Sequence, residues 1–247
     1  MYALISSFFF VCAIASPFPK HEAKPLYWLL AGDSTTAPDG GWGDAFLSTT
    51  VASDSSGHNY GHSGATTASF RASGNWTSVT RDINTYKSDY QVFVTIQFGH
   101  NDQKNTSGVS LSQYKENLLN FVKETTTAGG HPILVTPLTR RNFQSDGKVA
   151  ENLATQRNIT IEVATYSKTK YIDLNKASET YVNAIGKDAA SKYNLAAGDW
   201  THLNEWGGVV FARIVSDLLV EKYPVEFEAH TKANDTLSDI IKAGEPA

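Results

Sequence analysis

Short apolar runs alternate with longer amphipathic stretches along most of the chain. Four of the apolar runs are bounded by Gly, Pro, Asp or Asn: LYWLLA (26–31), QVFVTIQF (91–98), HPILVTP (131–137) and KYIDL (170–174). The segment Gly57–Gly61 is a weaker, fifth candidate. Short apolar runs between turn-forming residues are typical of buried strands. The pattern therefore predicts four buried strands and a fifth, weaker one.

The amphipathic stretches between these runs predict helices near 110–127, 150–168 and 204–222. Ser112 is the expected cap of the first helix, and Asn204 is the expected cap of the last. Strands that alternate with helices indicate a parallel sheet with helices on both faces, so the expected fold class is α/β. Ligands bind such sheets at the carboxyl ends of the strands, so the residues just after each strand are the candidates for a site.

The composition fits one soluble α/β domain. The chain has 247 residues, of which 41% are hydrophobic and 19% charged, with a formal net charge of -4. A chain of this length can bury a sizeable core without disulfides. Because nucleic-acid recognition needs clustered Lys and Arg, the mildly acidic balance argues against a nucleic-acid partner. No apolar stretch reaches the roughly 18 residues that span a bilayer, so we expect no membrane partner, and we expect a monomer.

The first residues have the pattern of a secretion signal. Residues 1–15 contain a short apolar run that ends in Ala13-Ile14-Ala15, a small-x-small pattern like that of signal-peptidase sites. No Lys or Arg precedes this run, and a buried N-terminal strand or helix is the alternative. Residues 16–25 are interpreted as a proline-broken segment that leads into the domain. The only cysteine, Cys12, lies within the expected signal, so the mature chain would have no thiol.

Four N-x-S/T sequons accompany this signal, at Asn75, Asn105, Asn158 and Asn234. Any one of them could arise by chance. Four sequons together with a leader favour a glycosylated protein that is secreted to the extracellular space.

Polar and glycine-rich residues follow several of the expected strands. They are Gly32-Asp33-Ser34-Thr35 after the first strand, Gly61–Gly64 after the weak strand and Gly99–Asp102 after the strand at 91–98. Near the C-terminus, Asp199 and His202 precede the last helix. A serine nucleophile needs a base, the base needs an orienting partner, and the oxyanion needs preorganised donors. Residues of all three kinds are therefore present at these positions.

These positions supply the parts of an acyl-transfer site. Ser34 would be the nucleophile at a strand-to-helix turn, His202 would accept its proton, and Asp199 would fix the imidazole tautomer. Three donors would hold the oxyanion: the backbone N–H groups of Ser34 and Gly64, and the side-chain amide of Asn101. Each motif alone has a plainer interpretation, as a capped turn or as a surface histidine.

Histidines and tryptophans suggest two further interpretations. His58, His62 and His100 could indicate a metal, but no HExxH or comparable ligand spacing is present, so we expect neither a metal nor a cofactor. Tryptophans mostly pack in the core or at the rim of a protein. Trp200 lies within the motif DWTH and is the candidate for stacking on a sugar ring of the substrate.

Four sequence blocks resemble those of a known family. GDST at 32–35, the glycine of NYGHSG at 59–64, GHND at 99–102 and DWTH at 199–202 are similar, in this order, to the blocks of the SGNH (GDSL-type) hydrolases. The resemblance covers roughly 26–222 and is closest to the rhamnogalacturonan acetylesterase branch.

The resemblance implies a fold, a domain layout and a set of site residues. It implies a flavodoxin-like three-layer α/β/α sandwich with a central, mostly five-stranded parallel sheet. The hydrolase domain would span 26–222, followed by a peripheral polar tail at 223–247. The resemblance assigns the same five residues to the roles given above, so the functional residue in GHSGA would be Gly64 rather than Ser63. The branch usually has an arginine directly after this glycine, whereas this chain has Ala65, which leaves the substrate contacts at that rim open.

The expected function is that of a secreted serine esterase, a carboxylic ester hydrolase whose partner is an acetylated polysaccharide. The resemblance implies a plant cell-wall substrate, with rhamnogalacturonan in pectin as the first candidate. One alternative is the same chemistry on acetylxylan or on a lipid or aryl ester, because the fold does not select the substrate. A second alternative is a carbohydrate-binding protein without turnover. Loops rich in Gly, Ser, Thr and Asn favour a hydrated substrate over a lipid.

Overall fold

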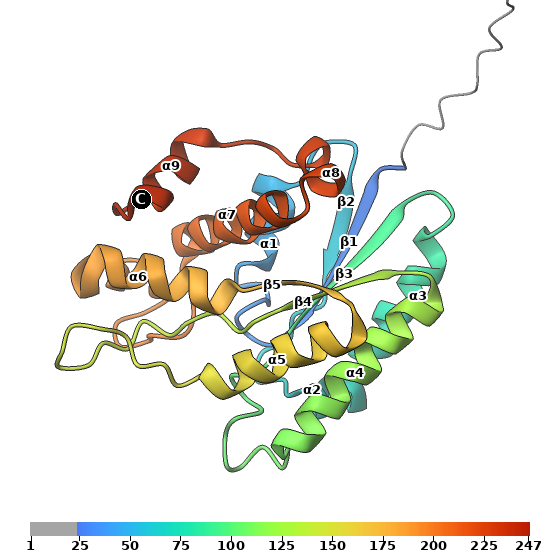
Figure 1. Ribbon diagram of the computed structural model, residues 1–247, viewed down its shortest axis with the longest axis horizontal. Helices are drawn as coiled ribbons and strands as arrows, with labels where there is room; N and C mark the ends of the chain where they lie inside the picture. The colour runs from blue at the N-terminus through green and yellow to red at the C-terminus, as the bar shows by residue number, and fades with distance from the viewer. Residues whose placement is uncertain (1–23) are drawn as a thin grey trace, which may run out of the picture.

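The centre of the protein is a five-stranded sheet of order β2-β1-β3-β4-β5, in which every neighbouring pair is parallel (Figure 1). The computed structural model describes residues 24–247, so the expected signal at 1–15 and most of the segment at 16–25 lie outside the described residues. The strands are β1 (Leu26–Gly32), β2 (Ser56–Asn59), β3 (Gln91–Gln97), β4 (His131–Val135) and β5 (Lys170–Ile172). All five coincide with the predicted strands to within a few residues.

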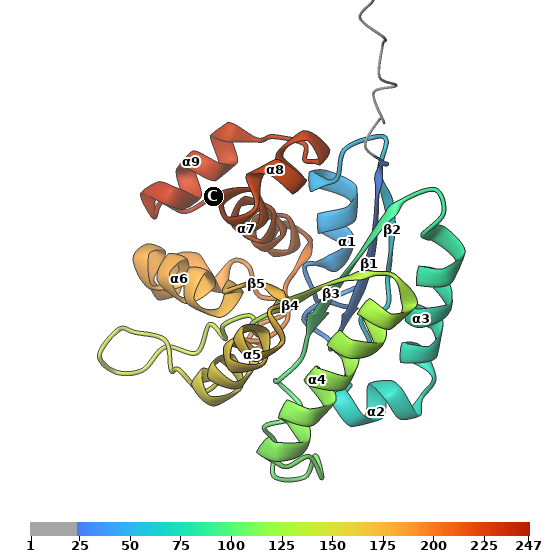
Figure 2. The ribbon, with the colours of Figure 1, turned by 45° about the vertical axis from the view of Figure 1, so that its right-hand side comes forward.

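Helices cover both faces of the sheet, which confirms the three-layer α/β/α fold (Figure 2). One face is covered by α2 (Thr67–Ala72), α3 (Asn75–Tyr86), α4 (Leu111–Ala128) and α5 (Ala154–Ser167). The other face is covered by α1 (Gly43–Ala45), α6 (Leu174–Ser191), α7 (Glu205–Lys222), α8 (Pro224–Phe227) and α9 (Asp235–Ala243). A π-helical turn, η1 (Phe46–Thr50), continues α1, and a 3₁₀ turn, η2 (Glu228–His230), continues α8.

Strand β1 shows why both faces are covered. Every residue of LYWLLAG is buried, and its side chains alternate between two core clusters. Leu26, Trp28 and Leu30 pack on the α7 side, whereas Tyr27 and Leu29 pack on the side of α3 and α4. Successive side chains of a strand point to opposite faces, so an uninterrupted apolar strand is stable only between two helical layers.

The helix predictions were correct in place but not in every detail. The cap of α4 is Ser110, whose side chain accepts a hydrogen bond from the Gln113 N–H in a capping box, and the expected cap Ser112 lies inside the helix. Asn204 caps α7 as expected, since its side chain accepts a hydrogen bond from the Gly207 N–H. Helix α6 was not predicted, because its sequence is rich in small and polar residues and is interrupted at Gly186, whose φ is 78°. Helix α3 was missed for a similar reason, since most of its residues are polar.

The segment 223–247, expected as a polar tail, contains α8, η2 and α9. Two of its side chains, Phe227 and Leu237, are buried in the same core cluster as α7. No helix among residues 24–247 is both long enough and apolar enough to cross a membrane.

Candidate active site

Ser34 lies in a tight turn directly after β1, at the carboxyl end of the sheet. The Asp33 carbonyl accepts hydrogen bonds from the N–H groups of Thr36 (3.1 Å) and Ala37 (3.0 Å), so the chain makes a single helix-like turn. The expected strand-to-helix junction was wrong in this respect, because the first helix begins only at Gly43. The turn leaves the Ser34 side chain near the surface, although the residue as a whole is only 8% exposed.

Hydrogen bonds with buried polar side chains fix the conformation of this turn. Asp33 Oδ1 accepts hydrogen bonds from the Thr35 N–H (2.9 Å) and the Thr35 hydroxyl (2.8 Å). The buried Gln97 side chain, at the end of β3, donates to the Thr35 hydroxyl and accepts a 2.8 Å hydrogen bond from the Trp42 indole N–H. These bonds join the turn to the neighbouring strand, so the position of Ser34 depends on residues distant in sequence.

The carboxyl group of Asp33 is held in its charged form. Burial raises its pKa, but the His100 ring, whose Nδ1 lies 3.4 Å from Asp33 Oδ2, and the hydrogen bonds from Thr35 outweigh that effect. The pKa of Asp33 is therefore below its ordinary value. The residue next to Ser34 is thus a buried carboxylate.

His202 and Asp199 meet Ser34 from a loop at the other end of the sequence. His202 Nε2 lies 2.9 Å from Ser34 Oγ, and His202 Nδ1 lies 2.8 Å from Asp199 Oδ2. Asp199 Oδ1 also accepts hydrogen bonds from the N–H groups of Thr201 (3.0 Å) and His202 (2.9 Å). Burial raises the pKa of Asp199, but these hydrogen bonds and the imidazole outweigh it, so the pKa lies below its ordinary value. The hydroxyl, the imidazole and the carboxylate thus form one hydrogen-bonded chain.

Arg141 holds the loop that carries His202. Its Nη2 donates to the His202 carbonyl (2.6 Å), its Nε donates to Asn194 Oδ1 (2.6 Å), and its own N–H donates to the Trp200 carbonyl (2.8 Å). Burial lowers the pKa of Arg141 to about 10, with the Asp199 carboxylate acting in the opposite direction. The guanidinium is therefore still charged at neutral pH.

Two of the three candidate oxyanion donors, Gly64 and Asn101, lie on two further loops. Gly64 is exposed and has a φ of 77°, a left-handed conformation that side-chain-bearing residues rarely adopt. Within the described residues, the N–H groups of Ser34 and Gly64 donate a hydrogen bond to no backbone carbonyl. Asn101 donates from Nδ2 to the Ala65 carbonyl (3.0 Å), and its Oδ1 accepts a 2.6 Å hydrogen bond from Lys104 Nζ. The amide of Asn101 is therefore oriented by contacts on both of its polar atoms.

Asp102 joins these two loops. Its Oδ1 accepts hydrogen bonds from the N–H (2.9 Å) and the hydroxyl (2.6 Å) of Thr67, the first residue of α2. Burial raises the pKa of Asp102, although the two bonds from Thr67 oppose that effect. Ala65, which stands where the related branch usually has arginine, is buried in the core cluster beneath α2. Its methyl group therefore does not reach the rim.

A cavity of about 500 Å³ adjoins His202, and its lining includes Arg140, Asn142, Trp200 and Thr201. Trp200 is 48% exposed, which places its side chain at the open rim of this cavity. Ser63 is also exposed, but in the described part of the chain its hydroxyl has no hydrogen-bonded partner. Residues 24–247 contain no group of three or more His, Cys, Asp or Glu side chains that could hold a metal ion.

The sequons lie on the surface to different degrees. Asn105, Asn158 and Asn234 are exposed, and Asn75, the first residue of α3, is partly exposed. Asn234 also caps α9, since its Oδ1 accepts a hydrogen bond from the Leu237 N–H. A glycan on Nδ2 would leave that cap in place.

Four residues around the site were not found from the sequence: Gln97, Lys104, Arg140 and Arg141. Arg140 and Arg141 stand in TPLTRRNF shortly after β4, and a post-strand position was the signal that could have found them. Gln97 is inside a strand, and Lys104 is one lysine among many on the surface, so neither had a sequence signal.

Similarity to known proteins identifies the family of the chain. A model of the GDSL-like Lipase/Acylhydrolase family matches residues 30–208, a stretch that includes all the candidate catalytic and oxyanion residues. The chain belongs to this family and is a carboxylic ester hydrolase. The family expected from the four sequence blocks is confirmed.

Three known proteins are similar to this chain over most of its length. The rhamnogalacturonan acetylesterase RhgT of Bacillus subtilis (strain 168) is 28% identical over 217 residues, which cover 80% of this chain and 91% of that protein. The crystal structure of the Bacillus subtilis protein YXIM superposes with a TM-score of 0.69 at 24% identity, and covers 81% of this chain and 57% of that one. The acetylxylan esterase Axe2 of Geobacillus stearothermophilus superposes with a TM-score of 0.56 at 18% identity, and covers 81% and 94%. These two structures show the shared fold.

Proposed function

We propose that the protein is a secreted serine esterase that removes acetyl groups from rhamnogalacturonan in the pectin of plant cell walls. The observation that carries the proposal is the hydrogen-bonded chain from Ser34 Oγ through His202 to Asp199, in a member of an acylhydrolase family. The choice of substrate is supported by the similarity to RhgT over most of both chains.

In the first half of the reaction, Ser34 Oγ attacks the acetyl carbonyl carbon while His202 Nε2 takes the hydroxyl proton. Asp199 holds the ring with Nδ1–H toward its carboxylate and stabilises the imidazolium that forms. The tetrahedral oxyanion accepts hydrogen bonds from the N–H groups of Ser34 and Gly64 and from the Asn101 amide. The intermediate then collapses, the sugar oxygen leaves with the proton from His202, and Ser34 is left acetylated.

In the second half of the reaction, a water molecule hydrolyses the acetyl-enzyme. His202 takes a proton from a water molecule as its oxygen attacks the acetyl carbonyl, and the same three donors hold the second oxyanion. Collapse of this intermediate breaks the bond to Ser34 Oγ, which regains its proton from His202. The products are acetate and the free enzyme.

The surroundings of Ser34 favour a hydrated substrate. The cavity beside His202 is lined by an arginine, an asparagine, a threonine and one exposed tryptophan. Sugar rings bind to surfaces of this kind through hydrogen bonds and through stacking on an aromatic face. A lipase would instead need a large apolar patch beside its serine.

The test is to compare acetate release from three substrates: acetylated rhamnogalacturonan, acetylated xylan and a long-chain ester. We expect the highest kcat/KM on acetylated rhamnogalacturonan. Faster release from acetylated xylan or cleavage of the long-chain ester would reject the proposed substrate but not the esterase mechanism. If a serine-reactive organophosphate failed to label the protein, the non-catalytic carbohydrate-binding alternative would replace the proposal.

Secretion, glycosylation and a monomeric state belong to the same proposal. The apolar run at 1–15 and the four surface sequons support secretion and glycosylation. We expect the secreted chain to begin near residue 16, to lose mass on endoglycosidase treatment and to elute as a monomer. N-terminal sequencing, mass spectrometry and size-exclusion chromatography measure these three outcomes.

A further inference from the structure

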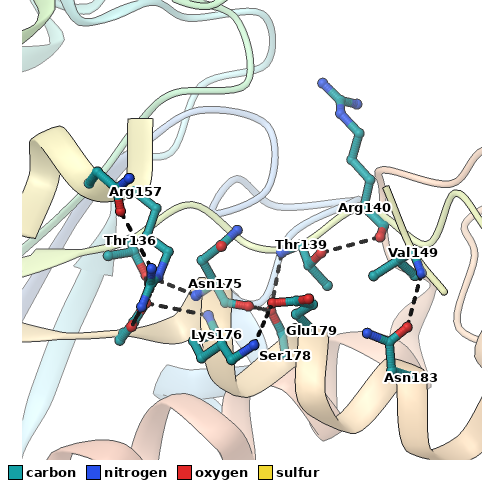
Figure 3. A network of polar contacts seen from close by, with 12 residues as sticks. Thr136, Thr139, Arg140, Val149, Arg157, Asn175, Lys176, Ser178, Glu179 and Asn183 are labelled. Carbon is teal, nitrogen blue, oxygen red and sulfur yellow. Dashed lines mark hydrogen bonds and ion pairs between the residues drawn. The ribbon is translucent and has the colours of Figure 1, made fainter. Parts of the chain in front are cut away.

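The loop after β4 is held by a network of polar contacts (Figure 3). The Thr136 hydroxyl donates to Asp173 Oδ1 (2.9 Å), and Arg157 donates from Nε to both oxygens of that carboxylate (2.9 and 3.0 Å). Further along the loop, the Thr139 N–H donates to the Ser178 hydroxyl (3.1 Å). The backbone next to Arg140 is therefore anchored to α5 and α6, and the residue projects from a rigid base.

The Arg140 side chain takes no part in that network, and in Figure 3 its guanidinium points away from it. Within the described residues the guanidinium makes one hydrogen bond, from Nη1 to the Thr201 hydroxyl. Its Nε and Nη2 donate to no side chain or carbonyl there, and it forms no ion pair. One edge of a planar donor fork is thus unused, and Arg140 is one of the residues that line the cavity beside His202.

Among the described residues, no carboxylate forms an ion pair with Arg140. Burial lowers its pKa, and the more distant carboxylates of Asp33 and Asp199 act in the opposite direction. Both carboxylates are engaged elsewhere, Asp33 with Thr35 and Asp199 with His202. A half-buried guanidinium without an ion-pair partner is electrostatically suited to an anion, and its fork matches a carboxylate with two parallel hydrogen bonds.

The other residues of the cavity suit a sugar. Trp200 offers an exposed indole face, and Asn142 offers an amide that can both donate and accept. His202, which contacts Ser34 Oγ, lines the same cavity, so a ligand here lies next to the reacting acetyl group. A volume of about 500 Å³ is within the range of small-ligand pockets.

We propose that Arg140, Trp200 and Asn142 form a subsite for a uronic acid residue of the polysaccharide, with Arg140 binding its carboxylate. This inference rests on the proposed function and adds the requirement that the substrate carry a carboxylate. A backbone of alternating neutral and acidic sugars carries a carboxylate on every second unit, whereas the main chain of xylan carries none. The subsite would therefore make the enzyme select acidic polysaccharide.

The test compares one acetylated rhamnogalacturonan oligosaccharide in two forms, with free uronate carboxylates and with the carboxylates methyl-esterified. Acetate is measured specifically, so cleavage of the methyl ester does not count. We expect wild-type kcat/KM to be roughly ten- to hundredfold higher for the acidic form, the size of a charge-assisted hydrogen bond in a binding site. In Arg140→Gln this ratio should fall to near one, and Arg140→Lys should give an intermediate ratio.

The ratio is the readout because a general loosening of the loop lowers activity on both forms alike. Lys148→Gln removes an exposed cation from the same β4–α5 connection and should keep the wild-type ratio. A wild-type ratio near one, or an unchanged ratio in Arg140→Gln, would overturn the inference. If Arg140→Gln does not fold, the inference is tested by the ratio for the wild type and by the ratio for Arg140→Lys.

A second assay separates this inference from the proposed function. Digalacturonate should inhibit hydrolysis of 4-nitrophenyl acetate by the wild-type protein competitively, and at least tenfold more strongly than its dimethyl ester does. Equal inhibition by the two compounds would reject the subsite even if rhamnogalacturonan is deacetylated. Selective inhibition without any acetate release from polysaccharide would reject the proposed function and keep the subsite.

Discussion

Arg141 Nη2 donates a 2.6 Å hydrogen bond to the backbone carbonyl of His202, so a residue that follows β4 holds the loop of the candidate catalytic base. Arg141 is only 2% exposed, and the second hydrogen bond of its guanidinium reaches Asn194 in the same loop. His202 can stay 2.9 Å from Ser34 Oγ only while this loop is fixed. Arg141 therefore connects the stability of the domain to the geometry of the site.

Arg141→Met should lower both stability and turnover. The substitution leaves the His202 carbonyl and the Asn194 amide oxygen without their donor, which costs about 2–4 kcal/mol of the free energy of unfolding. Urea unfolding measures this loss, and acetate release measures the fall in kcat. Arg81→Met is the control, because Arg81 has a side chain 67% exposed and should change stability by less than about 0.5 kcal/mol. Equal unfolding midpoints for the two variants would contradict the assigned role.

Ser34→Ala should abolish turnover without unfolding the protein. Loss of a serine nucleophile lowers kcat by roughly 10⁴- to 10⁶-fold in other serine hydrolases. The matched control is Ser63→Ala, which removes the exposed hydroxyl of GHSGA and should leave acetate release near the wild-type rate. The opposite result, an active Ser34→Ala and an inactive Ser63→Ala, would exchange the roles of the two serines.

Asn101→Ala should fold normally and lose about 10²- to 10³-fold in kcat, the contribution of one oxyanion donor. The loss should fall on kcat rather than on KM, because the amide interacts more strongly with the oxyanion than with the ground-state carbonyl. Steady-state kinetics on a small acetyl ester separates the two constants. Asn84→Ala, an exposed change on α3, is the control. Full activity in Asn101→Ala would refute its place in the oxyanion hole.

Gln97→Leu should destabilise the protein and disturb the Ser34 turn together. The substitution leaves the buried Trp42 indole N–H without its acceptor and the Thr35 hydroxyl without its donor, at a cost of about 1–3 kcal/mol for each group. Urea unfolding and acetate release should both respond. Gln91→Leu makes the same change at an exposed position on the same strand, so its unfolding midpoint should stay close to that of the wild type.

Asp173 should contribute stability that disappears in acid. Burial raises its pKa, but Arg157 and Thr136 outweigh that effect, so the folded-state pKa lies below the ordinary value of 3.8. The contribution is therefore fully present above pH 3.8 and is lost as the pH falls through the folded-state pKa. Asp173→Asn should lower the free energy of unfolding by about 1–3 kcal/mol at pH 7, and by less at pH 3. Urea unfolding at both pH values measures the gap, and a gap of constant size would contradict the assignment.

The strands and the helices α4, α5 and α7 could be predicted because they follow from local patterns, whereas α3 and α6 lack such a pattern. β1 has only apolar and aromatic side chains, and β3 is mainly apolar between its terminal glutamines; this pattern is typical of strands that are buried on both faces of a sheet. The Ser34 turn was placed correctly but described as a helix start, because the side chains that close it, Asp33 and Gln97, act through contacts that a local pattern does not contain.

The sequence by itself determined the α/β class, the order of the strands along the chain and the four blocks that carry the candidate site. Those blocks could be found because each follows a strand or precedes a helix, where the residue types are constrained locally. Only the tertiary structure decided that Ser34 and His202, 168 positions apart, meet at 2.9 Å, and that Arg140 and Arg141 lie beside them. The physical reason is that parallel strands bring their carboxyl ends to one edge of the sheet, whereas side-chain contacts across that edge depend on the packing of loops from different parts of the chain.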